Sequence, residues 1–354
     1  MSDYISVSVA VIGAGFAGIA AVRQLRESGV DDVIVLEKAT ELGGVWRDND
    51  YPGCACDIPS TLYSFSFAPN PGWTSSFASQ REILAYLRDC ARRFGVTERI
   101  RFGAEVVSAN WDAAARRWLL DTTGGRFGAE VLIVATGPFA RPSVPDIPGL
   151  AEFAGETFHS ARWNHDHDLT GRRVAVVGTG ASAIQIVPAV AGKARAVHVY
   201  QRTPPWVLPK RVRPTPAAVR SLYRRVPAAQ RAVRAVQYWS RELPGYAMTR
   251  PRLLAMIQRQ ALAHLRAQVP DARLRARLTP GYTIFCKRVL VSSDYYPTLT
   301  RPHVELVDDP IARVERDSII TADGARRPVD TIVLATGFTV TRHPIAERLY
   351  GVDG

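Results

Sequence analysis

The sequence predicts an α/β fold made of two nucleotide-binding domains of similar type, with a basic helical segment inserted in the second domain. A glycine-rich turn follows a short apolar strand twice, at residues 13–18 and 178–183, and a helical pattern follows each turn. Two later apolar strands, at residues 131–137 and 331–337, both end in Ala-Thr-Gly. With 354 residues, of which 47% are hydrophobic and 22% charged, the chain has the length of two domains and an ordinary globular composition.

The first glycine-rich turn joins a strand at residues 7–12 to a helical pattern that runs from Ile19, and its candidate cofactor-binding residues are Gly13, Gly15, Phe16 and Gly18. The strand is almost continuously apolar, as expected for a strand buried on both faces of a parallel sheet. Gly13 permits the tight turn, Gly15 lets a pyrophosphate approach the backbone, and Gly18 lets the helix pack on the strand. The helix N-terminus then offers N–H groups to the phosphates.

The next strand, at residues 33–36, ends at Glu37, 19 residues after Gly18. A carboxylate at this position accepts hydrogen bonds from ribose hydroxyls and repels a 2′-phosphate. The strand, the turn, the helix and the acid together predict a Rossmann-like dinucleotide-binding domain.

The pattern recurs with the turn at residues 178–183, after a strand at residues 173–177. The candidate binding residues of this turn are Gly178, Gly180 and Ser182. The strand that follows, residues 196–200, ends differently, in Arg202 and Thr203. An acidic side chain would accept hydrogen bonds from ribose hydroxyls, whereas an arginine at this position can bind a 2′-phosphate. The arginine therefore points to NADP rather than NAD.

Two nucleotide folds with different ribose partners suggest two different dinucleotides, and FAD with NADP(H) is the natural pair. The sequence therefore predicts a flavoenzyme with two Rossmann-like domains of the three-layer ββα type. The expected boundaries are residues 1–145 for the FAD domain, 146–210 and 280–338 for the NADP domain, 211–279 for the helical insertion, and 339–354 for the start of a second FAD-domain segment.

The net charge of +12 is concentrated in one segment, residues 210–279, which holds 16 basic residues against two acids. The rest of the chain has a net charge of −2. Apolar residues at helical intervals, such as Leu253, Ile257 and Leu265, favour a helical insertion with a solvated basic face over a nucleic-acid surface. We expect no nucleic-acid partner, and the sequence indicates no protein partner.

Other functional classes lack their motifs. Cys54 and Cys56 have the wrong spacing for a Cys-x-x-Cys redox pair, and no Gly-x-Ser-x-Gly elbow is present. Residues 165–168, His-Asp-His-Asp, are expected to form a solvated loop, so we expect no metal. The longest apolar run is too short for a membrane span, no secretory signal is apparent, and four scattered cysteines favour the cytoplasm.

Two longer motifs carry a family resemblance. Residues 153–164 match Phe-x-Gly-x-x-x-His-x-x-x-Trp, although Asn164 stands where the family has proline or aspartate. Residues 43–57 contain Gly-Gly-Val-Trp, Tyr-Pro-Gly and Asp57 in the right order. The chain thus resembles the type I Baeyer–Villiger monooxygenases, including bacterial 4-hydroxyacetophenone and cyclohexanone monooxygenases, from about Val9 to Phe338.

The resemblance implies roles for individual residues. Arg288 corresponds to the catalytic arginine of the family, and Asp57 is expected to hold it by a charge-assisted hydrogen bond. Lys287 is expected to share the 2′-phosphate of NADP with Arg202. His159 is expected to have a structural role. The implied FAD contacts are Gly44, Val45, Trp46, Asp57 and Tyr63.

The resemblance also implies the reaction. An FAD- and NADPH-dependent enzyme would insert one oxygen atom of O2 next to a ketone carbonyl through a C4a-peroxyflavin, giving an ester or lactone, with thioethers as further substrates. NADP+ is expected to remain bound during this step. Two alternatives stay open: an N- or S-oxygenating flavin monooxygenase or uncoupled NADPH oxidase, and a non-catalytic NADP-binding fragment.

The chain ends at Gly354, 16 residues after Phe338, whereas members of the family continue further. The expectation is a truncated relative with an incomplete FAD domain. An uncovered apolar sheet face would cost about 25 cal/mol per Å² exposed, so we expect low stability and weak FAD retention.

Overall fold

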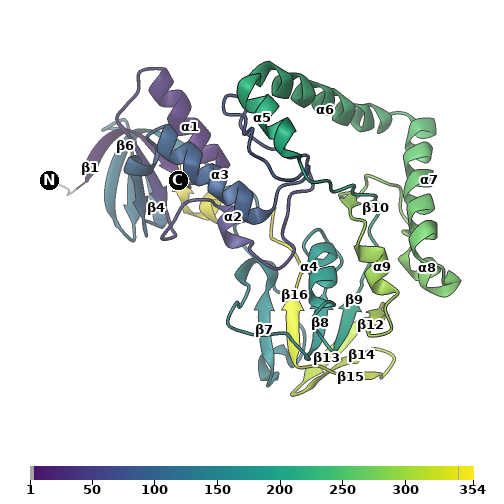
Figure 1. Ribbon diagram of the computed structural model, residues 1–354. Helices are drawn as coiled ribbons and strands as arrows, with labels where there is room; N and C mark the ends of the chain where they lie inside the picture. The colour runs from purple at the N-terminus through teal and green to yellow at the C-terminus, as the bar shows by residue number, and fades with distance from the viewer. Residues whose placement is uncertain (1–3, 342) are drawn as a thin grey trace. The chain divides into compact units, whose positions relative to one another are not determined.

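The computed structural model describes residues 4–341 and 343–354, and the chain divides into two compact units (Figure 1). Unit 1 contains Met1–Asp50, Gln80–Ser143 and Phe338–Gly354, and unit 2 contains Tyr51–Ser79 and Val144–Gly337. Residues 1–3 and 342, which fall in the expected FAD-domain segments, lie outside the described residues.

Unit 1 is built on a seven-stranded sheet with the order β17-β4-β5-β6-β1-β2-β3. Strands β6, β1, β2 and β3 run parallel, and β4, β5 and β6 form an antiparallel meander on the same sheet. The strands are β1 (Ile5–Ile12), β2 (Val33–Glu37), β3 (Ile100–Phe102), β4 (Val106–Asp112), β5 (Arg117–Thr122), β6 (Gly125–Val134) and β17 (Leu349–Tyr350).

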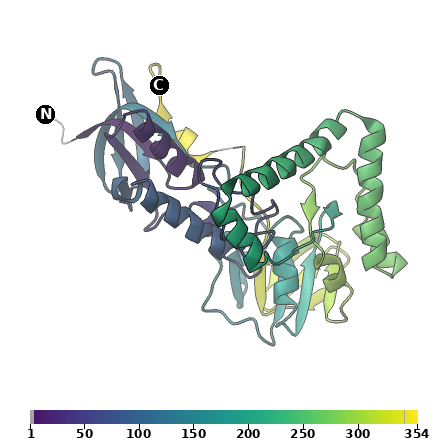
Figure 2. The ribbon, with the colours of Figure 1, turned by 45° about the horizontal axis from the view of Figure 1, so that its top comes forward.

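Helices α1 (Phe16–Glu27) and α3 (Gln80–Arg93) contact each other and lie beside the parallel part of this sheet (Figures 1 and 2). The sequence explains this placement, because the buried residues of β1 and those of β2 before Glu37 are apolar and need cover on both faces. The shorter helices of unit 1 are α2 (Val45–Asp48), η1 (Thr97–Arg99) and η4 (Pro344–Arg348).

Unit 2 has three layers around a parallel five-stranded sheet with the order β12-β9-β8-β16-β7. Its strands are β7 (Glu156–His159), β8 (Arg173–Val177), β9 (Ala196–Tyr200), β12 (Val304–Val307) and β16 (Thr331–Leu334). An antiparallel sheet of β13 (Ile311–Glu315), β14 (Ser318–Thr321) and β15 (Arg326–Pro328) forms a second layer. Helices α4 (Ala183–Val190) and α9 (Tyr295–Leu299) form the third.

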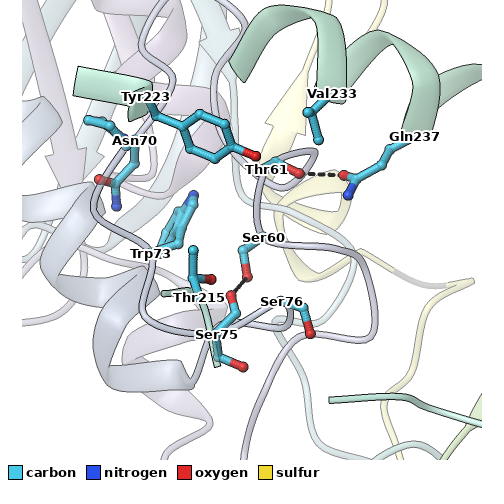
Figure 3. A pocket seen from close by; sticks show the side chains of 11 residues that line it. Ser60, Thr61, Asn70, Trp73, Ser75, Ser76, Thr215, Tyr223, Val233 and Gln237 are labelled. Carbon is cyan, nitrogen blue, oxygen red and sulfur yellow. Dashed lines mark hydrogen bonds between the residues drawn. The ribbon is translucent and has the colours of Figure 1, made fainter. Parts of the chain in front are cut away.

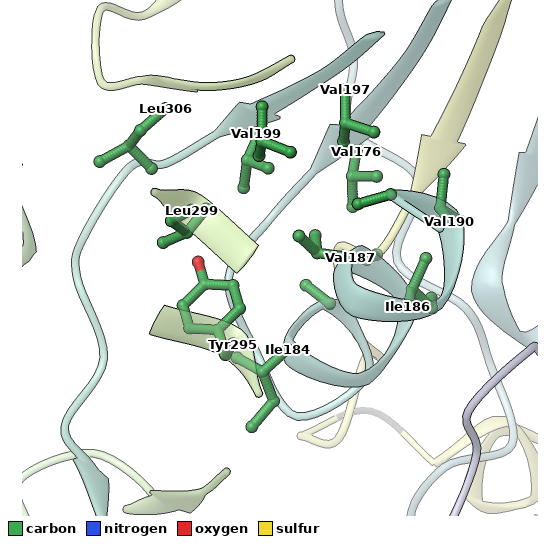
Figure 4. Packing of buried hydrophobic residues seen from close by; sticks show 14 of the residues in the cluster. Val176, Ile184, Ile186, Val187, Val190, Val197, Val199, Tyr295, Leu299 and Leu306 are labelled. Carbon is green, nitrogen blue, oxygen red and sulfur yellow. The ribbon is translucent and has the colours of Figure 1, made fainter. Parts of the chain in front are cut away.

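Two apolar clusters join these layers. On the helical side, Val176 and Val199 of the sheet pack with Ile184 and Val187 of α4 and with the buried Tyr295 (Figure 4). On the other side, Ala175, Tyr200 and Ile332 of the sheet pack with Val314 and Ile319 of the antiparallel layer. Burial on both faces requires strands that are apolar at successive positions, which is the pattern of Arg173–Val177 and Thr331–Leu334.

The basic segment is helical, as its periodicity predicts. It forms α5 (Ala217–Arg225), α6 (Pro227–Ala247), α7 (Pro251–Gln268) and α8 (Ala272–Leu278), between the short parallel strands β10 (Val207–Leu208) and β11 (Leu290–Val291). Leu265 of α7 is buried, and Ile257 and Leu262 pack around Trp206 and Ile284. None of the helices within the described residues has the length and apolar character that crossing a membrane requires. Two irregular turns, η2 (Leu150–Glu152) and η3 (Ser160–Arg162), complete the unit.

The predicted α/β class and the two parallel nucleotide folds are confirmed. The division into units differs from the expected boundaries at residues 51–79, which the sequence assigned to the FAD domain and which belong to unit 2. This stretch contains no helix or strand, so periodicity offered no guide to its place. The two Ala-Thr-Gly endings also lie just past β6 and β16 rather than inside them.

Candidate active site

The first glycine-rich loop connects β1 to α1 in unit 1, and its glycines are sterically required. Gly13 has a φ of 105°, and a Cβ there would lie 2.8 Å from the carbonyl oxygen of Ala135. A Cβ on Gly18 would collide with the carbonyl oxygen of Gly13. Among the described residues, no side chain caps α1 at Gly15 and no acid lies in the first turn. The loop therefore fits the pyrophosphate of a dinucleotide, which would lie at this helix N-terminus.

Glu37 ends β2 with a buried carboxylate, 4% exposed, beside this loop. Its Oε2 accepts a hydrogen bond of 2.9 Å from the Ala14 N–H, and its Oε1 accepts one of 3.0 Å from the Ala39 N–H. The Arg47 guanidinium lies 3.1 Å from the same Oε1. Burial opposes the charge on Arg47, but Asp48 and Glu37 outweigh it and raise the pKa of Arg47. These bonds hold the Glu37 carboxylate at the loop, in the position expected for a ribose partner.

The Gly-Gly-Val-Trp motif reaches the same loop. Gly44 has a φ of 54°, and a Cβ there would lie 3.3 Å from the Cα of Gly15. Val45 and Trp46 then begin the short helix α2, and the Gln80 side-chain amide donates a 2.5 Å hydrogen bond to the carbonyl of Trp46. Unit 1 thus brings all the residues expected around the FAD together, except Asp57 and Tyr63.

The second glycine-rich loop connects β8 to α4 in unit 2. Gly178 has a φ of 116°, and a Cβ there would collide with the carbonyl oxygen of Ala335. A Cβ on Gly180 would meet nothing within 4 Å, so the space beside this residue is open. Ser182 is the N-cap of α4, and its side chain makes no capping hydrogen bond. This loop has room for a second pyrophosphate at the start of α4.

The expected 2′-phosphate ligands lie on two segments. Arg202 is exposed just after β9, and the carbonyl of Thr203 accepts a 3.0 Å hydrogen bond from the Thr179 hydroxyl, which ties this turn to the glycine-rich loop. The Lys287 ammonium lies 4.9 Å from the centre of the Tyr282 ring. That Arg202 and Lys287 share a phosphate stays a prediction.

Asp57 and Arg288 form an ion pair within unit 2, from the Arg288 guanidinium to Asp57 Oδ2. The Asp57 side chain is 23% exposed and the Arg288 side chain 58%, so the pair is open to solvent on the arginine side. Tyr63 lies in the same unit, in the turn where its N–H donates to the carbonyl of Pro59. The guanidinium is permanently charged and presents several donors to an anion.

The loop that carries Asp57 is held by the second nucleotide fold. The Gln185 side chain of α4 accepts from the Ala55 N–H at 2.9 Å and donates to the Ala55 carbonyl at 3.2 Å. A Cβ on Gly53 would lie 2.8 Å from the Gln185 carbonyl oxygen, so the loop backbone touches α4. Tyr51 is buried in the core of unit 2, and this burial raises its pKa. These contacts explain why residues 51–57 belong to unit 2.

The motif at residues 153–164 builds the edge strand β7 of unit 2. Gly155 is required because a Cβ there would lie 2.5 Å from the carbonyl oxygen of Asp330. Trp163 packs edge to face on Phe158, with the ring centres 4.9 Å apart. Asn164, at the position that departs from the family pattern, donates a 2.7 Å hydrogen bond to Glu156.

His159 ends β7 with both ring nitrogens engaged. Its Nδ1 accepts from the Ala161 N–H at 3.1 Å, which leaves Nε2 to donate to the Gly337 carbonyl at 3.0 Å. Burial lowers the pKa of His159, although the bond to Gly337 opposes this. These contacts are those of a neutral histidine that joins β7 to the segment after β16. Its expected part in domain motion stays a prediction.

Cys56 and the His-Asp-His-Asp loop at residues 165–168 make contacts within unit 2. Burial raises the pKa of Cys56 to about 12, which suppresses the reactive thiolate. His167 contacts the Thr331 hydroxyl at 2.8 Å. Within residues 4–341 and 343–354, no group of three or more potential ligand side chains could hold a metal ion.

A cavity of about 120 Å³ lies in unit 2 between the 60–76 loop and helices α5 and α6 (Figure 3). Trp73 and Tyr223 form its aromatic walls, and Thr61 bonds Gln237 across it. The side chains that line it are uncharged. The cavity therefore suits a neutral molecule better than an ion.

Comparisons with known proteins agree with this geometry. Residues 6–217 match the family model described as flavin-binding monooxygenase-like. A protein of Streptomyces coelicolor named Baeyer-Villiger monooxygenase is 49% identical over 349 residues, which cover 98% of this chain and 67% of that protein. The structure of an oxidized steroid monooxygenase bound to NADP superposes with a TM-score of 0.88 at 34% identity, covering 98% of this chain and 74% of that one.

The chain belongs to the Baeyer–Villiger monooxygenases. The family predicted from the two sequence motifs is therefore confirmed. The structure of OTEMO in complex with FAD and NADP is also similar, with a TM-score of 0.84 at 30% identity, over 98% of this chain and 74% of that chain. This Baeyer–Villiger chain spans about two thirds of the length of its curated relatives.

Three residues of this Baeyer–Villiger chain have site contacts that the motifs did not reveal. Arg47 holds Glu37, Gln185 holds Ala55, and the Lys210 ammonium donates a 2.9 Å hydrogen bond to the Cys56 carbonyl. Arg47 directly follows the Gly-Gly-Val-Trp motif, and Lys210 is one of only four lysines beside 41 arginines. Those two positions were visible signals, whereas nothing in the sequence marks Gln185.

Proposed function

We propose that this chain is an FAD- and NADPH-dependent monooxygenase that inserts one atom of O2 next to a ketone carbonyl. The observation that carries the proposal is the Asp57–Arg288 pair, formed by the two residues that the family resemblance selects as catalytic. The related structures bound to NADP, or to both FAD and NADP, support the choice of cofactors.

The residues present fit both cofactors. In unit 1, Gly13, Gly15 and Gly18 leave room for a pyrophosphate, and Glu37 offers a carboxylate to ribose hydroxyls. In unit 2, the open space at Gly180 receives the second pyrophosphate, and Arg202 with Lys287 offers cations to a 2′-phosphate. The flavin, when bound, supplies the electron transfer and oxygen activation that no protein side chain provides.

The protein contributes charge and position. Arg288 keeps its positive charge at every physiological pH, so it stabilises negative charge that develops on oxygen during the transfer. Asp57 accepts a charge-assisted hydrogen bond from this guanidinium, which restricts the orientation of the Arg288 side chain. The neutral His159 links β7 to Gly337 and takes no part in proton transfer.

The substrate we propose is a neutral ketone, with a thioether as a second class, and the similar steroid and cyclohexanone monooxygenases support a neutral substrate. We further propose a cytoplasmic location, because the four cysteines, all among the described residues, form no disulfide.

The test is product analysis under ¹⁸O2. The chain is reconstituted with FAD and supplied with NADPH and either cyclohexanone or a thioether. We expect lactone carrying one ¹⁸O atom and one NADPH oxidised for each lactone formed. Sulfoxide without lactone would favour the N- or S-oxygenating alternative, and hydrogen peroxide equal to the NADPH oxidised would indicate an uncoupled oxidase. NADPH binding without flavin binding would leave a non-catalytic NADP-binding protein.

A further inference from the structure

Lys210 lies just after β10 and is half-buried against the loop that carries Asp57. Its ammonium donates a 2.9 Å hydrogen bond to the carbonyl of Cys56, the residue before Asp57. The same nitrogen lies 4.9 Å from the centre of the Phe77 ring. The side chain thus attaches the backbone next to Asp57 to the end of β10.

The backbone of Lys210 bonds to Ser293, which lies just after β11, the strand that follows Arg288. The Lys210 N–H donates to the Ser293 hydroxyl at 3.1 Å, and this hydroxyl donates to the Lys210 carbonyl at 2.9 Å. Ser293 extends the pairing of β10 with β11, in which the Ser292 N–H donates to the Leu208 carbonyl at 3.0 Å. Arg288 lies two residues before β11.

These contacts close a ring of interactions. Asp57 pairs with Arg288, and the chain runs from Arg288 through β11 to Ser293. The Ser293 hydroxyl bonds to the Lys210 backbone, and the Lys210 ammonium returns to the residue before Asp57. An exposed ion pair by itself contributes only about 0–1 kcal/mol and does not hold a guanidinium in one place. Other contacts must therefore fix the geometry, and those of Lys210 reach the residue before Asp57 and Ser293, five residues after Arg288.

The charged and polar groups around the Lys210 ammonium also link it to the Asp57 loop. Burial lowers the pKa of Lys210, and the charge of Asp57 is the largest influence that opposes the shift. The other groups that raise this pKa are the thiols of Cys54 and Cys56 and the carboxylate of Asp294. A half-buried cation bonded to the residue before Asp57 also adds positive charge to the loop that carries this carboxylate.

We propose that Lys210 is a positioning residue that fixes Asp57 against Arg288 and thereby sets the geometry of the catalytic arginine. The part of this inference that concerns catalysis rests on the function proposed above. The part that concerns the arrangement of the three charged groups does not.

The arrangement is tested in the cofactor-free chain by NMR with ¹³C-labelled lysine. The chain has four lysines, Lys38, Lys193, Lys210 and Lys287, so Lys→Arg variants assign all four signals. We expect Lys210 to titrate below the ordinary lysine pKa of about 10.4, and lower still in Asp57→Asn, because the opposing carboxylate is lost. A Lys210 signal that titrates at the ordinary lysine pKa and ignores Asp57→Asn would overturn the arrangement.

The catalytic part is tested with Lys210→Met, Lys210→Arg and the exposed control Lys193→Met. We expect Lys210→Met to lower kcat for ester formation at least tenfold and to divert NADPH oxidation to hydrogen peroxide, with the KM for NADPH changed less than twofold. Lys210→Arg, which keeps a cation and donor, should restore most of kcat. Equal losses in kcat and in NADPH affinity, without rescue by arginine, would indicate a merely structural residue.

The two readouts separate this inference from the proposed function. If wild-type chain forms no oxygenated product, the proposed function fails, and the titration of Lys210 still decides the arrangement. If wild-type chain forms product and Lys210→Met has the same kcat, the positioning role is refuted while the proposed function stands.

Discussion

Asp57 and Arg288 form an ion pair although 231 positions separate them in the sequence. Neither residue belongs to a helix or strand, so the pair depends on how two loops are anchored. Gln185 of α4 and Lys210 after β10 hold the Asp57 loop, and β11 holds the Arg288 segment. The contacts that hold this pair, which we propose to be catalytic, lie within unit 2.

Replacing Arg288 by methionine removes the positive charge and keeps most of the side-chain volume. We expect the rate of ester formation to fall about 100-fold or more, the usual cost of losing one electrostatic stabiliser. NADPH affinity, measured by fluorescence titration, should change less than threefold.

Arg313→Met is the matched control, because Arg313 is an exposed arginine paired with Glu315 on β13. It should keep the wild-type rate. A wild-type rate of ester formation in Arg288→Met would remove Arg288 from the mechanism.

Substitutions at two glycines of the second nucleotide loop should affect different properties, NADPH binding at Gly180 and stability at Gly178. Gly180→Ala adds a methyl group to open space, so the free energy of unfolding should change by less than about 0.5 kcal/mol. The same methyl group would lie where the pyrophosphate is expected to contact the backbone. The affinity for NADPH should therefore fall at least about tenfold, which corresponds to about 1.4 kcal/mol of binding free energy.

Gly178→Ala should instead lower the free energy of unfolding. Its Cβ would collide with the Ala335 carbonyl, and its φ of 116° is strained for alanine. Urea unfolding and calorimetric NADPH titration of both variants make the comparison. Equal NADPH affinity in wild type and Gly180→Ala would argue against this binding site.

The Arg47–Glu37 pair of unit 1 is buried, with side-chain exposures of 12% and 6%. Arg47→Met leaves the Glu37 carboxylate buried with backbone partners alone, and breaking a buried pair in this way costs about 3–5 kcal/mol. Arg88→Met breaks an exposed pair with Glu41 and should cost about 0–1 kcal/mol. Urea unfolding of the flavin-free chain measures both, and similar losses in the two variants would contradict the assigned role of Arg47.

His159 makes stability depend on pH. Burial lowers its pKa in the folded chain below the unfolded value of about 6.5, so the unfolded chain takes up the proton first as the pH falls. The stability is therefore complete above about pH 6.5 and declines as the pH falls below this value towards the folded pKa. His198, whose pKa is also lowered by burial although Glu305 opposes this, acts in the same direction.

We expect the free energy of unfolding of wild-type chain to fall between pH 7.5 and pH 5.5, and to fall less in His159→Gln. Urea unfolding at the two pH values measures the difference. An equal decline in wild type and variant would show that His159 does not contribute.

The two nucleotide folds were predictable from local sequence patterns. Glycine is required at positions 13 and 178 because the backbone there has a positive φ and leaves no room for a side chain. The Ala-Thr-Gly segments occur in both folds, and the carbonyls of Ala135 and Ala335 lie against these two glycines. Such requirements involve short stretches of chain with regular periodicity, which sequence patterns record directly.

The place of the loop at residues 51–79 and the contacts that hold Asp57 could not be predicted from the sequence and follow from the packing of unit 2. That loop has no regular secondary structure and hence no periodicity. Its place depends on single hydrogen bonds from side chains more than 100 positions away, such as Gln185 to Ala55 and Lys210 to Cys56. A glutamine or a lysine looks the same in a sequence whether it meets water or a backbone carbonyl, so only the packed chain distinguishes the two.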